Sequence, residues 1–345
     1  MNNFDEIMEK ITSGLTGDAP TDLVYLKKQC EEYKEHPLAK EIIRACSRMM
    51  FKLIPEDKRK ELDKIIDNEM NGIDATLDEV QFNVYKKEYD KALHILEHLI
   101  EKLEDSGMSQ DDSVSEYHDF GEPFEEIIYD YIHKPTKTLR PASFPFARIY
   151  LQYGSLLFEV KRFKEAQQAL EKARRWNPSN ASIAFEYIET YKALGDMDSF
   201  YRLTRDTFAI AFRPNDVARC YRNLGYYFVE QKDYEAAQCC YLLSLLYDSD
   251  AKNAQAELYY ISQKSPIPLP EPSPDHLFEV LEKHHVPIHP DNDLIGLSVA
   301  YGKHAYGQKD MEAALYFLTI AYGLTQDDEI GKIVESLQKE KKEMN

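Results

Sequence analysis

Four copies of a helix-hairpin pattern recur along this chain at a nearly constant spacing. The second helix of each copy carries an alanine at the same point of the pattern: Ala92, Ala166, Ala237 and Ala314. Successive alanines are 74, 71 and 77 residues apart, which is close to two hairpins of about 34 residues each. Because a single hairpin cannot bury its apolar faces, the spacing predicts hairpins stacked side by side.

The clearest copy runs from residue 147 to residue 180. Its apolar and small residues recur at i, i+3, i+4 and i+7 in the first helix and at i, i+4 and i+7 in the second, which is typical of amphipathic helices. A glycine in the first helix predicts close approach of the second, and Asn177-Pro178 ends the hairpin. The positions concerned are Tyr150, Tyr153, Gly154, Leu157, Ala166, Leu170 and Ala173.

This pattern resembles the tetratricopeptide repeat, whose consensus is W-x2-L-G-x2-Y followed by A-x3-F and P. The chain has Tyr in place of the Trp and the Leu, and Leu in place of the Tyr and the Phe. The resemblance covers residues 147–250 and 295–326, is weaker over 73–104, and does not include 1–70. A degenerate copy runs from Ala184 to Thr204, and its positions follow the matching positions of the central copy by 34 residues. The resemblance implies an all-α fold, a right-handed α-α superhelix of antiparallel hairpins with a helical N-terminal cap.

Six segments are predicted from these patterns. Residues 106–123 are so polar that we expect them not to pack, and we expect no substantial sheet anywhere in the chain. The segments are a helical cap (1–72), a degenerate hairpin (73–104), an acidic mobile loop (105–121), a central array (122–264), a proline-rich spacer (265–274), and a last hairpin with a capping helix (275–345).

Composition and net charge limit the partners and the cellular compartment that we expect for this chain. The net charge of −19 and a pI near 5.0 oppose binding to nucleic acid or to anionic membranes. No apolar run reaches the roughly 18 residues of a membrane span, and the N-terminus does not resemble a secretory leader. Five cysteines without a C-x2-C pair suit reduced thiols. We therefore predict a cytoplasmic protein that binds neither nucleic acid nor membrane.

Charge is distributed unevenly along the chain. Residues 101–130 hold eleven acids and one lysine, whereas residues 131–230 hold sixteen Lys and Arg against ten acids. One interpretation is that both are solvated faces. The other is that the acidic loop folds over the basic section and competes with a ligand there, so that deletion of residues 106–120 would raise ligand affinity.

One string has the form of a catalytic motif. His94 to His98 reads H-x2-E-H, in which the two histidines would hold zinc and Glu97 would act as a base. Leu96 and Leu99 take the packing positions of the same helix, so we predict surface histidines instead. The histidines at 276, 284, 285 and 289 are predicted to lie in loops and at helix ends. No phosphate-binding or serine-elbow motif occurs, and we predict neither catalysis nor a cofactor nor a metal.

The family resemblance also implies a ligand groove. In that family, positions two, five, nine and twelve of the repeat line the concave surface. In the three clear copies these positions are Arg148, Leu151, Ser155 and Phe158; Arg219, Arg222, Tyr226 and Val229; and Gly296, Val299, Lys303 and Tyr306. The degenerate copy adds Ser182, Phe185 and Glu189. The candidate groove residues are Arg148, Leu151, Phe158, Phe185, Arg219, Arg222, Tyr226, Lys303 and Tyr306.

This lining predicts a partner of a particular kind. Its apolar and basic side chains suit a protein or peptide segment with acidic groups, although Arg219 and Arg222 are also able simply to pair with nearby acids. Leu151 and Ser155 replace the Lys and Asn expected of a clamp for chaperone tails. We predict a non-catalytic scaffold or adaptor; the alternatives are a peptide-responsive bacterial regulator, a subunit of a fixed complex, and an H-x2-E-H metal enzyme.

Overall fold

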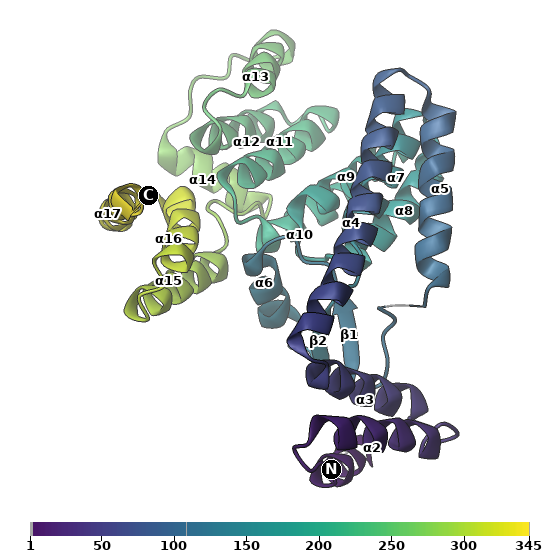
Figure 1. Cartoon of the computed structure of the whole chain (residues 1–345). Helices are drawn as coiled ribbons and strands as arrows, with labels where there is room; N and C mark the ends of the chain where they lie inside the picture. Colours follow the sequence, from purple (N-terminus) through teal and green to yellow (C-terminus); the bar gives the residue numbers. More distant parts are fainter. Residues whose placement is uncertain (1–2, 108, 345) are drawn as a thin grey trace. The chain divides into compact units, whose positions relative to one another are not determined.

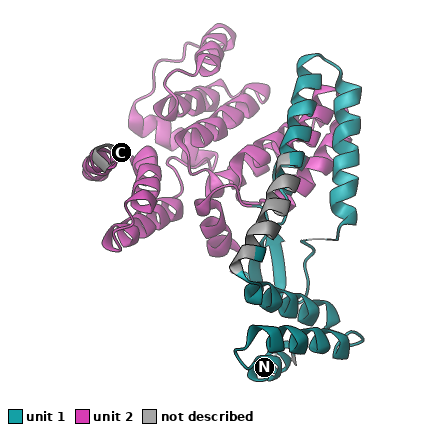
Figure 2. Ribbon diagram, viewed as in Figure 1, with its two compact units in different colours: residues 1–119, 135–149 teal, residues 120–134, 150–345 magenta. Residues whose placement is uncertain are grey.

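The computed structural model describes residues 3–107 and 109–344, so Met108 of the predicted acidic loop lies outside the described residues. Seventeen α-helices, one 3-10 helix and two short strands make up this part of the chain (Figure 1). The chain divides into two compact units, residues 1–119 with 135–149 and residues 120–134 with 150–345 (Figure 2). The all-helical class is thereby confirmed apart from one small sheet, and the six predicted segment boundaries stay predictions.

Unit 1 begins with a three-helix bundle closed around a small apolar core. Ile11, Leu26, Ile42 and Cys46 are fully buried there, as the amphipathic pattern of the first 53 residues predicts. A long helix and its partner then form the first hairpin. The elements are α1 (Asn3–Ser13), α2 (Ala19–Glu32), α3 (Ala39–Leu53), α4 (Glu56–Tyr85), α5 (Tyr89–Asp105), β1 (Ser115–His118) and β2 (Thr138–Pro141).

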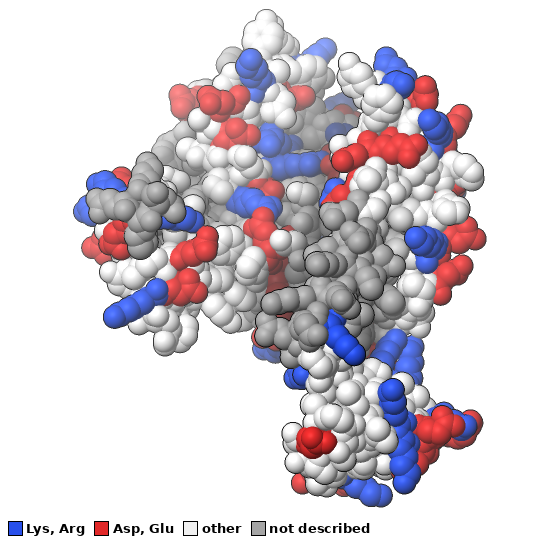
Figure 3. Space-filling view, in the orientation of Figure 1, with Lys and Arg blue, Asp and Glu red and all other residues white. Residues whose placement is uncertain are grey.

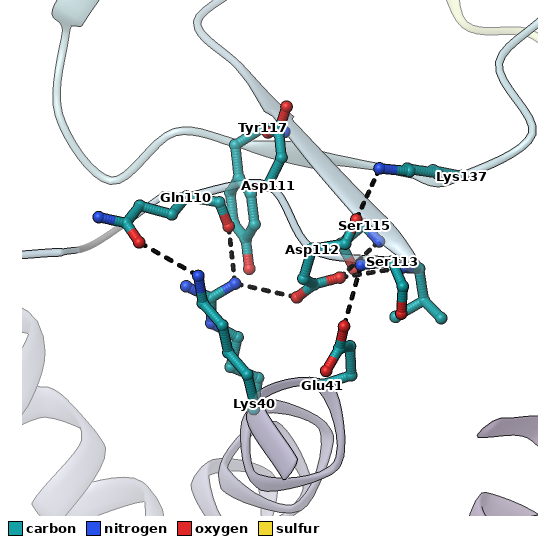
Figure 4. A network of polar contacts seen from close by, with 11 residues as sticks. Lys40, Glu41, Gln110, Asp111, Asp112, Ser113, Ser115, Tyr117 and Lys137 are labelled. Atoms are coloured by element: carbon teal, nitrogen blue, oxygen red, sulfur yellow. Dashed lines mark hydrogen bonds and ion pairs between the residues drawn. The ribbon is translucent and has the colours of Figure 1, made fainter. Parts of the chain in front are cut away.

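The acidic segment of unit 1 is structured, so the expectation that it is too polar to pack was wrong. β1 pairs in parallel with β2, with Tyr117 opposite Arg140. The Asp112 carboxylate accepts hydrogen bonds from the N–H groups of Val114 and Ser115 at 3.0 and 2.8 Å, and Glu41 of α3 accepts one from Ser113 (Figure 4). Carboxylates that are hydrogen-bonded in this way can be buried. Deletion of residues 106–120 would therefore remove β1 as well as any competing charge.

Unit 2 contains helix pairs that follow one another along the chain. α7 spans the boundary, with its first four residues in unit 1. The elements are α6 (Pro123–His133), α7 (Phe146–Glu159), α8 (Phe163–Trp176), α9 (Ala181–Leu194), α10 (Met197–Thr207), η1 (Phe208–Ile210), α11 (Pro214–Glu230), α12 (Tyr234–Tyr247), α13 (Lys252–Lys264), α14 (Pro274–Lys283), α15 (Asn292–Gly307), α16 (Met311–Thr325) and α17 (Asp328–Met344).

A glycine contact repeats in three of these hairpins and fixes how closely their helices pack. Gly154 faces Leu170, Gly225 faces Tyr241 and Gly302 faces Leu318. A Cβ atom added to these glycines would lie 2.5, 2.7 and 2.7 Å from the facing side chain, closer than real Cβ contacts. The glycines are thus required by the helix spacing, as the sequence pattern predicted.

The hairpin turns share one backbone geometry. Lys87, Lys161, Lys232 and Lys309 have φ between 61 and 64°, and Gly195 has φ of 80°. In each turn the next residue donates its N–H to a carbonyl five residues before it, for example Asp233 to Phe228 at 2.9 Å. This left-handed residue and its 6→1 bond end the first helix in the manner of a Schellman motif, and the second helix begins one residue later.

The tyrosines of the hairpins differ in burial. Tyr150 and Tyr221 are 2% and 0% exposed, whereas Tyr301, next to Gly302 in α15, is 43% exposed. Residues 265–273 are not helical, as their alternating prolines predict. Val334 and Leu337 of α17 cover Ala305 and Leu318, and α17 is therefore the predicted capping helix.

α6 belongs to unit 2 and links segments that are distant in sequence. The buried Glu125 carboxylate accepts hydrogen bonds from the side-chain amides of Asn177 and Asn180 at 2.8 and 2.7 Å. Glu122, at the start of the same helix, pairs with Arg213 and accepts a hydrogen bond from the Tyr316 hydroxyl at 3.0 Å. The loop after α8, the N-terminus of α11 and α16 are thus held through two neighbouring carboxylates.

Candidate functional site

A polar pocket of about 250 Å³ lies along α11 in unit 2. We call it the α11 pocket. α9, α12 and α13 supply the rest of its wall, which consists of Glu189, Lys192, Arg219, Arg222, Asn223, Tyr226, Tyr241, Asn253 and Glu257. Three predicted groove residues, Arg219, Arg222 and Tyr226, are brought together there, together with Glu189 from the degenerate copy.

The spacing of residues on α11 explains why this face lines a pocket. Residues 219, 222, 223 and 226 follow one another at i, i+3, i+4 and i+7, and so share one face of the helix. Cys220, Tyr221 and Leu224 lie on the opposite face and are fully buried in the core. The apolar face anchors the helix, and the polar face is left for the pocket.

Both pocket arginines already have acidic partners. Arg219 lies 3.1 Å from Glu186 and its guanidinium stands 4.7 Å from the Phe185 ring centre. Arg222 lies 3.0 Å from Asp248. The interpretation in which these arginines pair with nearby acids is therefore confirmed. The Arg219 pair is about a third exposed, and exposed pairs of this kind are weak, so a ligand carboxylate can replace Glu186 at small cost.

Tyr226 is held under a lysine. The Lys192 ammonium lies 3.9 Å from the Tyr226 ring centre, a cation–π distance, and 3.5 Å from Glu189. Burial raises the pKa of Tyr226, and the nearby carboxylates of Glu230, Glu189 and Glu257 raise it further. The phenol therefore stays protonated at neutral pH and is available as a hydrogen-bond donor.

Asn223 carries an unpaired donor in this wall. Its side chain is 8% exposed, and its Nδ2 atom is buried with no hydrogen-bond acceptor among the described residues. A buried amide that lacks a partner costs about 1–3 kcal/mol. The wall of the α11 pocket therefore contains an amide that is unsatisfied in the free protein.

A further predicted basic residue, Lys303, lies in a different pocket. Lys303 and Tyr306 of α15 line a cavity of about 420 Å³ against α17, and Tyr306 is 51% exposed. The other residues of this wall are Leu318, Lys332, Ile333, Ser336 and Leu337. The C-terminal helix therefore occupies the side of α15 that the resemblance assigned to a ligand.

The other predicted groove residues are not brought into either pocket. Arg148 lies in unit 1, where it pairs with Asp74 at 2.8 Å. Leu151 is half-buried, and Phe158 packs on Phe163 with ring centres 5.1 Å apart. Phe185 is only 1% exposed, so its role is to support Arg219 and not to contact a ligand.

Sequence reasoning missed several residues of the α11 pocket. Lys192, Asn223 and Glu257 lie outside the four lining positions of the repeat. Lys192 follows Glu189 at i+3, a spacing that places both on one helix face, and this was the available signal. Asn223 lies at i+4 from Arg219 on the same face of α11, so its place in the wall had a signal, whereas its lack of an acceptor depends on how the pocket is assembled.

The H-x2-E-H string lies on the surface of α5. Leu96 and Leu99 are buried, and His94 and His98 are exposed, which confirms the predicted packing of this helix. Among the residues whose side chains the structure describes, no three His, Cys, Asp or Glu are grouped to hold a metal ion. The same part of the chain holds no helix with the length and apolar character needed to cross a bilayer.

Surface charge is mixed in sign. On the face drawn in Figure 3, Lys and Arg side chains lie among Asp and Glu side chains and do not form one continuous basic patch. This distribution, with a net charge of −19, does not favour extended contact with a polyanion.

No protein-family model and no curated protein matches this chain. Solved structures do match, and several are tetratricopeptide repeat proteins. YrrB, described as having an unusual peptide-binding site, is 13% identical with a TM-score of 0.30, over 62% of this chain and 98% of its own. A tetratricopeptide repeat protein from Parabacteroides merdae is 12% identical with a TM-score of 0.36, over 97% and 98%. Yeast Tom70 is 11% identical with a TM-score of 0.31, over 94% and 59%.

Proposed function

We propose that this chain is a non-catalytic binding protein whose α11 pocket holds a short segment of a protein or peptide partner. The observation that carries the proposal is the grouping of Arg219, Asn223 and Tyr226 in one pocket wall, where the Asn223 amide is buried without an acceptor among the described residues and would turn toward the cavity to meet a ligand. An amide N–H donor matches a backbone carbonyl, which every peptide segment supplies. The partner would be a scaffold client or a regulatory peptide, and both present such a segment.

The size and chemistry of the pocket limit what enters it. A volume of about 250 Å³ is below the roughly 300–1,000 Å³ of small-molecule and cofactor sites. It suits one or two residues of a peptide whose remainder lies outside. Glu189 of α9 and Glu257 of α13 line the pocket together with Arg219 and Arg222 of α11, so a ligand residue can meet either sign of charge.

An acidic ligand group is best placed at Arg219. Arg222 is only 16% exposed and its pair with Asp248 is the more buried of the two. Arg219 is 33% exposed and its guanidinium lies over the Phe185 ring, 4.7 Å from the ring centre, an arrangement that holds it ready for a bidentate bond. We therefore propose a segment with a carbonyl at Asn223 and a carboxylate near Arg219.

The test is peptide selection followed by measurement on matched variants. Twelve-residue peptides from a random display library are selected on the full chain, and their Kd is measured by fluorescence anisotropy. Asn223→Leu keeps the shape of the side chain and is expected to weaken binding at least tenfold, because the bound carbonyl loses its donor. Asn215→Leu changes an exposed residue of the same helix and is expected to leave Kd unchanged.

Two results contradict the proposal. One is a selection that returns no peptide with a measurable Kd. The other is a set of peptides that bind Asn223→Leu as tightly as the unaltered chain, since the pocket would then have no part in recognition.

A further inference from the structure

Three arginines converge in unit 1, far in sequence from the α11 pocket. Arg44 and Arg48 are one helical turn apart on α3 and so share a face. The Arg44 guanidinium stands 5.7 Å from the ring centre of Tyr117 on β1. Tyr117 is paired in register with Arg140 of β2, and paired residues of adjacent strands lie on the same side of a sheet. The arginine face of α3 therefore meets the side of the sheet that carries Arg140.

Among the described residues, only Arg44 of these three arginines has an acidic partner. Arg44 donates to Asp112 Oδ2 at 2.9 Å, and the other oxygen of Asp112 is used by two backbone N–H groups. Glu41, on the same helix, accepts from the N–H of Ser113. No hydrogen bond or ion pair joins the side chains of Arg48 or Arg140 to any described residue, and the Nε atom of Arg140 is buried without an acceptor.

The positive charges of Arg48 and Arg140 repel each other. Burial lowers the pKa of Arg48, and the charge of Arg140 lowers it further, against smaller opposite effects from Tyr117 and Asp112. Lys137 adds a further positive group nearby, since its ammonium donates to the carbonyl of Asp112 at 2.6 Å. Half-buried guanidinium groups that lack acceptors and repel each other cost free energy, and a bound anion offsets that cost.

We infer that Arg48 and Arg140 form an oxyanion site between α3 and β2 that binds a phosphate group. A guanidinium matches phosphate oxygens with two parallel N–H bonds, and a dianion neutralises both arginines at once. A carboxylate neutralises only one of them, so phosphate is the better match. The site is independent of the α11 pocket, with which it shares no residue.

The inference makes a prediction about the protein in the absence of phosphate. Arg48→Gln removes a like-charge repulsion, so the variant is expected to be at least as stable as the unaltered chain in sodium chloride. In sodium phosphate the order is expected to reverse, because only the unaltered chain gains the bound anion. A purely structural role for Arg48 predicts a loss of stability in both salts.

The experiment uses the full chain and inorganic phosphate. Phosphate affinity is measured by isothermal titration calorimetry at pH 7.5, and Tm is measured in phosphate and in chloride at equal ionic strength. Arg48→Gln and Arg140→Gln are each expected to weaken phosphate binding at least tenfold. Arg162→Gln, which changes an exposed arginine of a hairpin turn, is expected to bind as the unaltered chain does. Arg140→Lys keeps a charge and serves if Arg140→Gln does not fold.

The outcomes separate the site from a general salt effect. Phosphate stabilises most proteins weakly by exclusion from their surface, and that effect is the same in all variants. Equal phosphate affinity in Arg48→Gln, Arg140→Lys and the unaltered chain, or no measurable binding, overturns the inference. Competition by O-phosphoserine compared with adenosine monophosphate then shows whether the phosphate belongs to a modified side chain or to a nucleotide.

Discussion

The hairpins α11/α12 and α15/α16 of unit 2 have the same framework and different surfaces. Four framework residues of the first recur 77 positions later in the second. The glycine that admits the facing side chain, the fully buried alanine, the left-handed lysine and the capping aspartate are all shared. The pairs are Gly225 and Gly302, Ala237 and Ala314, Lys232 and Lys309, and Asp233 and Asp310.

The outward positions of these hairpins have diverged. Where α11 has Arg222, Asn223 and Tyr226, α15 has Val299, Ala300 and Lys303. The α11 residues line a polar pocket, whereas the α15 pocket includes the apolar residues Leu318, Ile333 and Leu337 of α16 and α17 in its wall. Helix packing constrains the framework and leaves the outward positions free. Two copies of one hairpin therefore serve as a candidate recognition site and as the seat of the capping helix.

The largest expected effect tests the shared framework. Gly225→Ala and Gly302→Ala are each expected to lower the free energy of unfolding by about 1–3 kcal/mol, because the new Cβ meets Tyr241 or Leu318 at 2.7 Å. Gly296→Ala lies in α15 with nothing within 4 Å and is expected to raise it by about 0.5–1 kcal/mol through helix propensity. Urea unfolding measures all three.

The sign of the change is the decisive result. If Gly225→Ala or Gly302→Ala is stabilising like Gly296→Ala, then the close helix contact does not govern that hairpin, and the comparison fails for it.

The next prediction concerns the difference between the two surfaces. Asn223→Leu is expected to raise the free energy of unfolding of the ligand-free protein by about 1 kcal/mol, because a buried amide without an acceptor is removed. Ala300→Leu, at the equivalent and exposed position of α15, is expected to change it by less than about 0.5 kcal/mol. Chemical denaturation measures both. A destabilised Asn223→Leu would show that the amide is satisfied in the free protein.

A smaller effect is expected from the turns. Lys232 and Lys309 have φ of 61 and 63°, a region that costs a residue with a Cβ about 1 kcal/mol. Lys232→Gly and Lys309→Gly are therefore expected to stabilise the chain by up to about 1 kcal/mol each. Gly195 occupies the same turn position in the degenerate hairpin, so Gly195→Lys is expected to be destabilising by a similar amount. Thermal unfolding of the three variants checks this, and a neutral Gly195→Lys would contradict it.

The framework was predictable from sequence because each of its features depends on residues close in the chain. A glycine and the side chain it admits are sixteen residues apart in all three copies, so their recurrence is visible as a period. Asp112 shows the opposite case. Its partner Arg44 is 68 residues away, and no local pattern reveals that this carboxylate is satisfied. The acidic segment therefore reads as an unstructured loop although it forms a strand.

The candidate site was only partly predictable for the same reason. The lining positions of the repeat located Arg219, Arg222 and Tyr226, since one helix face carries all three. They misplaced Phe185, because the degenerate copy preserves too few framework residues to fix which face of α9 is buried. Asn223 was missed because its lack of an acceptor is a property of the assembled pocket and not of any spacing in α11.

The smallest expected effect is on the pH dependence of stability, and it concerns two aligned aspartates. Asp216 of α11 is 9% exposed, whereas the aligned Asp293 of α15 is exposed. Burial raises the pKa of Asp216 in spite of Arg213, which lies 3.6 Å away. A raised folded-state pKa means that the folded protein binds this proton more tightly, so its contribution to stability is full below the unfolded value of about 3.9 and is lost as pH rises through the folded value.

Asp216→Asn removes this titration and is therefore expected to gain stability relative to the unaltered chain as pH rises from about 4, with a plateau above the folded pKa. Asp293→Asn, at the aligned exposed position, controls for the loss of one negative charge. Free energies of unfolding from urea titrations between pH 4 and 8 give the comparison. A gain that shrinks with rising pH would mean that Arg213 outweighs burial at Asp216. The first turns of the two hairpins would then differ in exposure without differing in electrostatic cost.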